Sequence, residues 1–114
     1  MIIKENTMKI VEQAHVQKGD GTVIFKHLME NESVKHSRLF SEITLKKGCS
    51  IGYHEHHEET EYYWITQGTG IVAEKDGDKR VTKGDLVVTG NGESHSIRNE
   101  ADEDLVLMAL IILD

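Results

Sequence analysis

Residues 54–61 read HEHHEETE and place three histidines and four glutamates within eight positions. Imidazole and carboxylate groups bind both protons and divalent metals, so a segment this rich in them has three interpretations. It is a solvated turn, a helical zinc site, or the end of a strand that carries a metal. The spacing of the histidines distinguishes the second interpretation from the third.

The helical zinc motif HExxH requires a second histidine four positions after the first. Here Glu58 lies four positions after His54, and residues two apart on a helix face nearly opposite sides. A helical site is therefore excluded. On a strand, successive side chains alternate between faces, so His54 and His56 share one face while His57 points to the other. Two imidazoles placed in this way can bind the same metal ion.

A third ligand must come from beyond this strand. Residues 58–60, EET, suit a tight turn, and Glu61 then opens the aromatic strand EYYWIT. Because the chain reverses at the turn, Glu61 can return beside His56, and we expect it to be the third ligand. Glu58 and Glu59 are interpreted as solvated carboxylates of the turn.

Short strand signals bounded by Gly, Asp or Asn recur along the chain, and no helical period persists beyond the N-terminus. The expected strands are 22–28, 39–45, 51–56, 61–66, 70–75, 79–82, 85–89, 95–98 and 105–113. Asp76-Gly77 predicts a two-residue hairpin turn, and the apolar run LVLMALIIL at 105–113 is interpreted as a strand buried on both faces. Many short strands without helices predict a sandwich or a barrel.

Two segments of the chain follow known motifs. Residues 48–68 read G-x5-H-x-H-x4-E-x6-G, and residues 84–99 read G-x7-G-x2-H-x3-N. Both resemble the motifs of the cupin superfamily, in the form of its small bacterial single-domain members, and only the proline of the second motif is replaced, by Gly90. The resemblance implies an all-β double-stranded β-helix, or jelly-roll barrel, as a single domain over residues 1–114. The metal ligands that it implies are His54, His56, Glu61 and His95.

The overall charge restricts the partners of the protein. The chain has 20 acidic and 13 basic residues, a formal net charge of -7, whereas nucleic acids and anionic membrane surfaces require a basic footprint. Neither is an expected partner. The single Cys49, and a sequence without a secretory signal or a bilayer-spanning apolar run, favour the cytoplasm. Residues 1–20 are expected to form a polar arm, and a homodimer is expected to cover the edge strands.

Three imidazoles and one carboxylate leave two positions of an octahedral metal ion open. This ligand set suits one Mn(II), Fe(II), Co(II), Ni(II) or Zn(II) ion per chain. An open site favours a metal-dependent enzyme that acts on a small polar or carboxylate substrate, and the resemblance implies an oxygenase, decarboxylase or isomerase type. The alternatives are a non-catalytic module that binds or senses a small molecule and a purely structural jelly roll.

Two further residues are candidates for the pocket. Arg38 lies on the strand that leads into the first motif and is a candidate for binding an anion, while Tyr63 has the same strand parity as Glu61. The remaining histidines have no partner at a metal-binding spacing, and we interpret them as surface or internally paired residues. They are His15, His27 and His36.

Overall fold

The computed structural model describes residues 1–114 as ten strands and two short helical turns. The strands are β1 (Lys9–Ala14), β2 (Thr22–His27), β3 (Ser37–Leu45), β4 (Ser50–Glu55), β5 (Glu59–Gln67), β6 (Thr69–Glu74), β7 (Gly77–Thr82), β8 (Leu86–Gly90), β9 (Ser94–Arg98) and β10 (Leu105–Leu113). The helical turns are η1 (Glu5–Thr7) and η2 (Val16–Lys18). With three residues each, they fall far short of the length at which a helix can span a bilayer.

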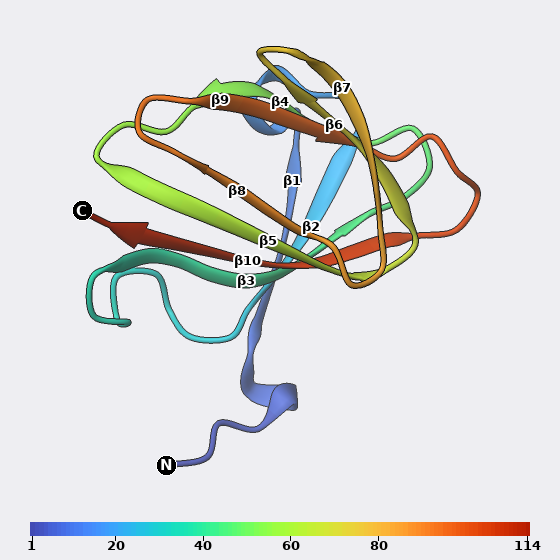
Figure 1. Cartoon of the computed structure of the whole chain (residues 1–114). Helices are drawn as coiled ribbons and strands as arrows, with labels where there is room; N and C mark the ends of the chain where they lie inside the picture. Colours follow the sequence, from blue (N-terminus) through green and yellow to red (C-terminus); the bar gives the residue numbers. More distant parts are fainter.

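The strands form two antiparallel sheets that face each other across the core (Figure 1). The six-stranded sheet has the order β1-β2-β3-β10-β5-β8, and the four-stranded sheet has the order β4-β9-β6-β7. Consecutive strands cross repeatedly from one sheet to the other, which is the jelly-roll arrangement. The predicted all-β jelly-roll fold is therefore confirmed.

The nine strands predicted from the sequence are all present, with ends that agree within two residues. The hairpin between β6 and β7 is displaced by one position, because the register pairs Glu74 with Gly77 and leaves Lys75-Asp76 as the two-residue turn. Gly77 instead takes the first strand position, at a φ of 122° that favours glycine.

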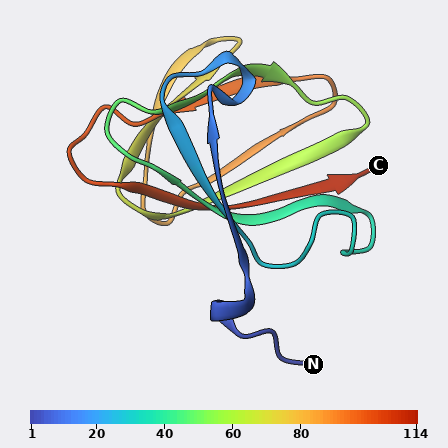
Figure 2. The same ribbon diagram turned by 180° about the vertical axis from the view of Figure 1, so that it is seen from behind.

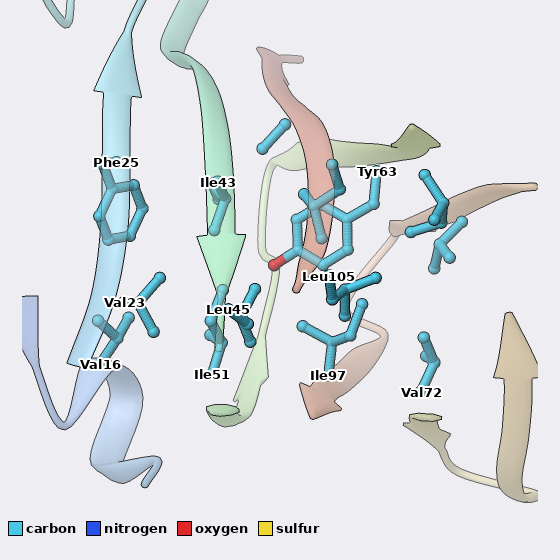
Figure 3. Packing of buried hydrophobic residues seen from close by; sticks show 14 residues of the cluster. Val16, Val23, Phe25, Ile43, Leu45, Ile51, Tyr63, Val72, Ile97 and Leu105 are labelled. Atoms are coloured by element: carbon cyan, nitrogen blue, oxygen red, sulfur yellow. The ribbon is translucent and has the colours of Figure 1, made fainter. Parts of the chain in front are cut away.

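The core lies between the two sheets and is built from alternating strand residues (Figure 3). In β10, Leu105, Leu107, Ala109 and Ile111 are buried, whereas the residues between them are half-buried. The prediction that this strand is buried on both faces is therefore wrong. Its second face lies on the outer side of the six-stranded sheet, where only neighbouring side chains cover it.

The N-terminal segment contains a strand that the sequence pattern did not reveal. Strand β1 pairs with β2 along its whole length, from Lys9 opposite His27 to Ala14 opposite Thr22, and Val16 in η2 joins the core. The description of residues 1–20 as an arm therefore needs correction, because only the residues before β1 project from the barrel (Figure 2). Five of the six residues of β1 are exposed, so its sequence shows no buried alternation.

Candidate metal centre

Two of the predicted ligands come from neighbouring strands of the four-stranded sheet. Antiparallel pairing of β4 with β9 places His54 directly opposite His95. The two side chains therefore leave the sheet on the same face, with ring centroids 4.7 Å apart. The pairing joins two residues that are far apart in the sequence.

The other two predicted ligands flank the turn between β4 and β5. His56 follows the end of β4 and keeps the orientation of His54, and Glu61 lies on β5 in the opposite sheet. The Nε2 atoms of His56 and His95 each lie 2.9 Å from Glu61 Oε1, and the Nε2 atom of His54 lies 3.8 Å from it. Nε2 of His95 is 3.1 Å from Nε2 of both other imidazoles. Four ligand atoms thus converge within 4.8 Å of one another.

The Nδ1 atom of each imidazole has a partner of its own. The Nδ1 of His54 lies 2.6 Å from the carbonyl oxygen of Gly52, and the Nδ1 of His56 lies 2.6 Å from Glu59 Oε2. These oxygens only accept hydrogen bonds, so both Nδ1 atoms donate and the neutral rings direct an unprotonated Nε2 towards the centre. The Nδ1 of His95 contacts the hydroxyl of Thr89 at 2.8 Å.

This arrangement fits a divalent cation. Three Nε2 lone pairs and a carboxylate converge in a buried space, with His56, Glu61 and His95 each at most 3% exposed. Neutral imidazoles placed in this way repel one another unless a proton or a metal ion lies between them. Hydrogen bonds from Nδ1 to carbonyl or carboxylate oxygens are the usual means of orienting a metal-binding histidine. The cluster therefore has the composition and the orientation of a metal site.

The ionisation of the cluster supports the same conclusion. Burial alone would raise the pKa of Glu61, but contacts with the three imidazoles outweigh burial and hold this pKa well below its usual range. Burial lowers the pKa of His95. For His56, burial would also lower the pKa, but contacts with the carboxylates of Glu61 and Glu59 outweigh burial and raise it. The site thus keeps one fixed negative charge among its imidazoles.

The turn carboxylate Glu59 has a different role from the predicted one. It is buried, and its two oxygens accept hydrogen bonds from Nε and Nη2 of Arg38 at 2.6 and 2.7 Å. The interpretation of Glu59 as a solvated residue is therefore wrong, although the neighbouring Glu58 is exposed. The alternation of side chains along β5 could have predicted this burial, because the strand begins at Glu59 and residues 59 and 61 share a face.

Arg38 and Tyr63, the predicted pocket residues, lie at the site in different ways. Arg38 lines the cavity in front of the cluster, but its guanidinium is paired with Glu59 rather than free. Tyr63 is buried and stacks on His95 with ring centroids 5.0 Å apart. Burial raises the pKa of its phenol well above the usual value, and the charge of Glu61 adds to this. The phenol therefore stays protonated.

Other histidines are divided between the surface and the cavity. His57 is exposed and pairs with Glu55, as the strand alternation predicts. His27 was interpreted as an ordinary residue, yet it lines the same cavity as the cluster and its Nδ1 lies 2.5 Å from the hydroxyl of Ser41. The cavity has a volume of about 250 Å³.

A family model described as a cupin domain matches residues 41–112. The chain belongs to the cupin family. It is 34% identical to an oxalate-binding protein of Thermotoga maritima, and the match covers 99% of this chain and 94% of that protein. Among solved structures, a predicted oxalate decarboxylase from Thermotoga maritima superimposes with a TM-score of 0.93 and 34% identity over 100% of both chains.

A more distant structure shows the fold alone. A sugar phosphate isomerase from Silicibacter pomeroyi, with 12% identity, superimposes with a TM-score of 0.80 over 100% of this chain and 76% of its own. The jelly roll of this cupin therefore occurs in proteins with different names and chemistry, and only the residues of the site bear on its function.

Proposed function

We propose that this cupin holds one divalent metal ion per chain and uses its open coordination positions for a small chelating carboxylic acid. The observation that carries this proposal is the convergence of three Nε2 atoms and one carboxylate oxygen within 4.8 Å. The proposed ligands are His54, His56, Glu61 and His95. No cysteine lies among them, which suits Mn(II), Fe(II), Co(II), Ni(II) or Zn(II) in an open site rather than a closed structural zinc site.

The names of the relatives support a carboxylate as the ligand. Oxalate chelates one metal ion through one oxygen of each of its two carboxylates, and an oxalate-binding protein is 34% identical to this chain over 99% of its length. A bound divalent ion would act as a Lewis acid that polarises an oxygen of the ligand. The chain itself would contribute the cavity walls that exclude water and the neutral phenol of Tyr63 beside the ligand set.

We propose catalysis on the bound acid, of a decarboxylase, oxygenase or isomerase type, as the primary function. Non-catalytic binding or sensing of the same acid is the second candidate, and the name of the oxalate-binding relative favours it specifically. Both candidates require the same metal and the same ligand. They differ only in whether the bound acid is converted.

The test begins with metal-free protein prepared with a chelator and reloaded with Mn(II), Fe(II), Ni(II) or Zn(II). Calorimetric titration with oxalate should show binding only to the loaded protein, and release of CO2 or uptake of dioxygen would establish catalysis. Glu61→Ala should lose both metal and oxalate binding, whereas His57→Ala, which changes an exposed imidazole, should keep them. Binding of oxalate without conversion of any small acid would favour the sensor. Loaded protein that binds no acid would refute the proposal.

We further propose that the protein is a cytoplasmic homodimer. The lone Cys49 is free, as is usual in a reducing compartment. Strand β1 leaves one edge of the six-stranded sheet unpaired, and Ile10 on this strand is 64% exposed. A second copy that covers this edge would satisfy its backbone groups and bury the isoleucine.

A further inference from the structure

The cavity in front of the His54–His56–Glu61–His95 ligand cluster has walls of two kinds. Its exposed lining residues are polar and mark the mouth: Gln13, Gln17, Asn31 and Arg38. Behind the mouth, apart from the imidazole of His27, the walls are largely apolar, and five of these residues form what we call the apolar collar: Phe25, Leu39, Ile43, Ile51 and Ile111. All members of the collar are buried except the half-buried Leu39. A ligand that reaches the cluster therefore passes polar groups first and apolar ones next.

Pairing of the strands holds the collar in place. Phe25 on β2 lies opposite Ile43 on β3, and Leu39 on β3 lies opposite Ile111 on β10. Each pair shares the inner face of the six-stranded sheet, and Phe25 and Ile43 lie on the same side of the sheet as Tyr63 (Figure 3). Ile51 completes the collar from the four-stranded sheet.

The cavity is larger than oxalate requires. In liquid water each water molecule occupies roughly 30 Å³. If each of the six non-hydrogen atoms of oxalate took that generous volume, the whole anion would fill about 180 Å³. The cavity measures about 250 Å³. Oxalate has no hydrocarbon group, so it offers no apolar surface that the collar could bury.

The charges of the site favour a monoanion. As a ligand of the proposed ion, the carboxylate of Glu61 supplies one negative charge, and the Arg38–Glu59 ion pair adds no net charge. A divalent ion would therefore leave one net positive charge, which a monocarboxylate cancels. The oxalate dianion would leave one net negative charge against apolar walls, where an uncompensated charge is costly.

We infer that the preferred ligand of this site is a 2-oxo or 2-hydroxy monocarboxylic acid with a short hydrocarbon chain. The inference rests on the proposed function, because the carboxylate and the neighbouring oxygen chelate the proposed metal. The hydrocarbon chain lies in the apolar collar, and the polar mouth admits the ligand from solvent.

The test compares acids of increasing length on Mn(II)-loaded protein by calorimetric titration. Glyoxylate, pyruvate, 2-oxobutanoate and 2-oxopentanoate share the chelating group and differ in the number of carbons. We expect affinity to rise about fourfold for each added methylene, since burying one is worth about 0.8 kcal/mol. We also expect 2-oxopentanoate to bind more tightly than oxalate.

The outcomes distinguish this inference from the function on which it rests. If oxalate binds and affinity is constant or falls along the series, the inference is overturned while the metal-and-acid function stands. If no acid binds to the loaded protein, both are overturned. The series requires no variant, so a folding defect cannot obscure it.

A matched pair of variants locates the effect in the collar. Leu39→Asn places a polar amide of similar size in the collar and should reduce the gain per methylene to less than twofold. Val88→Asn makes the same kind of change on β8, at an exposed position remote from the cavity, and should keep the fourfold gain. An unchanged gain in folded Leu39→Asn, checked by its circular dichroism spectrum, would refute the role of the collar.

Discussion

Gly52 on β4 permits a close approach of backbone segments that a single methyl group would prevent. A Cβ atom at this position would lie 2.0 Å from the carbonyl oxygen of Gln17 and 3.0 Å from the amide nitrogen of Gly19. Both atoms belong to the backbone around η2, which cannot move aside as a flexible side chain can. We therefore predict that Gly52→Ala separates η2 from β4.

The size of the effect follows from the contacts that this separation breaks. Exposing Val16, now 9% exposed, would cost about 1.5–3 kcal/mol. Asp20 and Ser50 exchange two hydrogen bonds of 2.8 and 2.9 Å, each worth about 1 kcal/mol. Alanine also restricts the unfolded chain, which returns about 0.4–1 kcal/mol. The expected net loss in the free energy of unfolding is about 2.5–4.5 kcal/mol.

Thermal unfolding followed by circular dichroism measures this loss, and for a chain of this size it should lower Tm by more than about 10 °C. Gly70→Ala is the matched control, because the one close contact of its added Cβ would be the Leu105 Cδ2 methyl, at 2.8 Å, while the carbonyl oxygen of Arg98 and the Cδ1 methyl of Ile97 would lie at 3.5 and 3.6 Å. A side-chain methyl can rotate away, so we expect a change within about 1 kcal/mol. Equal losses in the two variants would show that the approach of η2 to β4 does not depend on glycine.

Three further predictions concern the site and the assembly. His54→Ala and His95→Ala should each lower the affinity for the metal at least about 100-fold, whereas His57→Ala should leave it unchanged. Metal analysis after dialysis measures this, and retention of metal by the first two variants would exclude the proposed ligands. Arg38→Ala should lower the free energy of unfolding in urea by about 1 kcal/mol, because the guanidinium is half exposed but its loss leaves buried Glu59 without its cation; an unchanged midpoint would contradict this. Sedimentation at micromolar concentration should show a dimer, and a monomer would refute the proposed assembly.

The sequence predicted the parts of this protein in which alternation along a strand is strong. His54 and His56 share a face because they are two residues apart, and the motif spacing added Glu61 and His95. Strand β1 was missed because an edge strand with five exposed residues shows no alternation. Alternation along β5 places Glu59 on the same face as Glu61, but the predicted strand began at residue 61, two residues too late to include Glu59.

Arg38 and Tyr63 were predicted as pocket residues and do line the cavity, but its apolar lining could not be predicted. Phe25, Leu39 and Ile111 become neighbours only through the pairing of β2, β3 and β10. A shift of one residue in either pairing would turn every side chain of a strand to the other face. His27 was missed for this reason, since its place in the cavity depends on the register and not on its neighbours in the sequence.

The ligand cluster draws on both sheets of the barrel, because Glu61 lies on β5 while His54 and His95 lie on β4 and β9. An ion held there would act as a cross-link between the two sheets, joining Glu61 and His95, which are 34 residues apart in the sequence. The two sheets could then separate only after the ion had lost at least one ligand. Metal binding would therefore slow the opening fluctuations of the barrel, and amide hydrogens of β4 and β9 would exchange with solvent more slowly than in the metal-free protein.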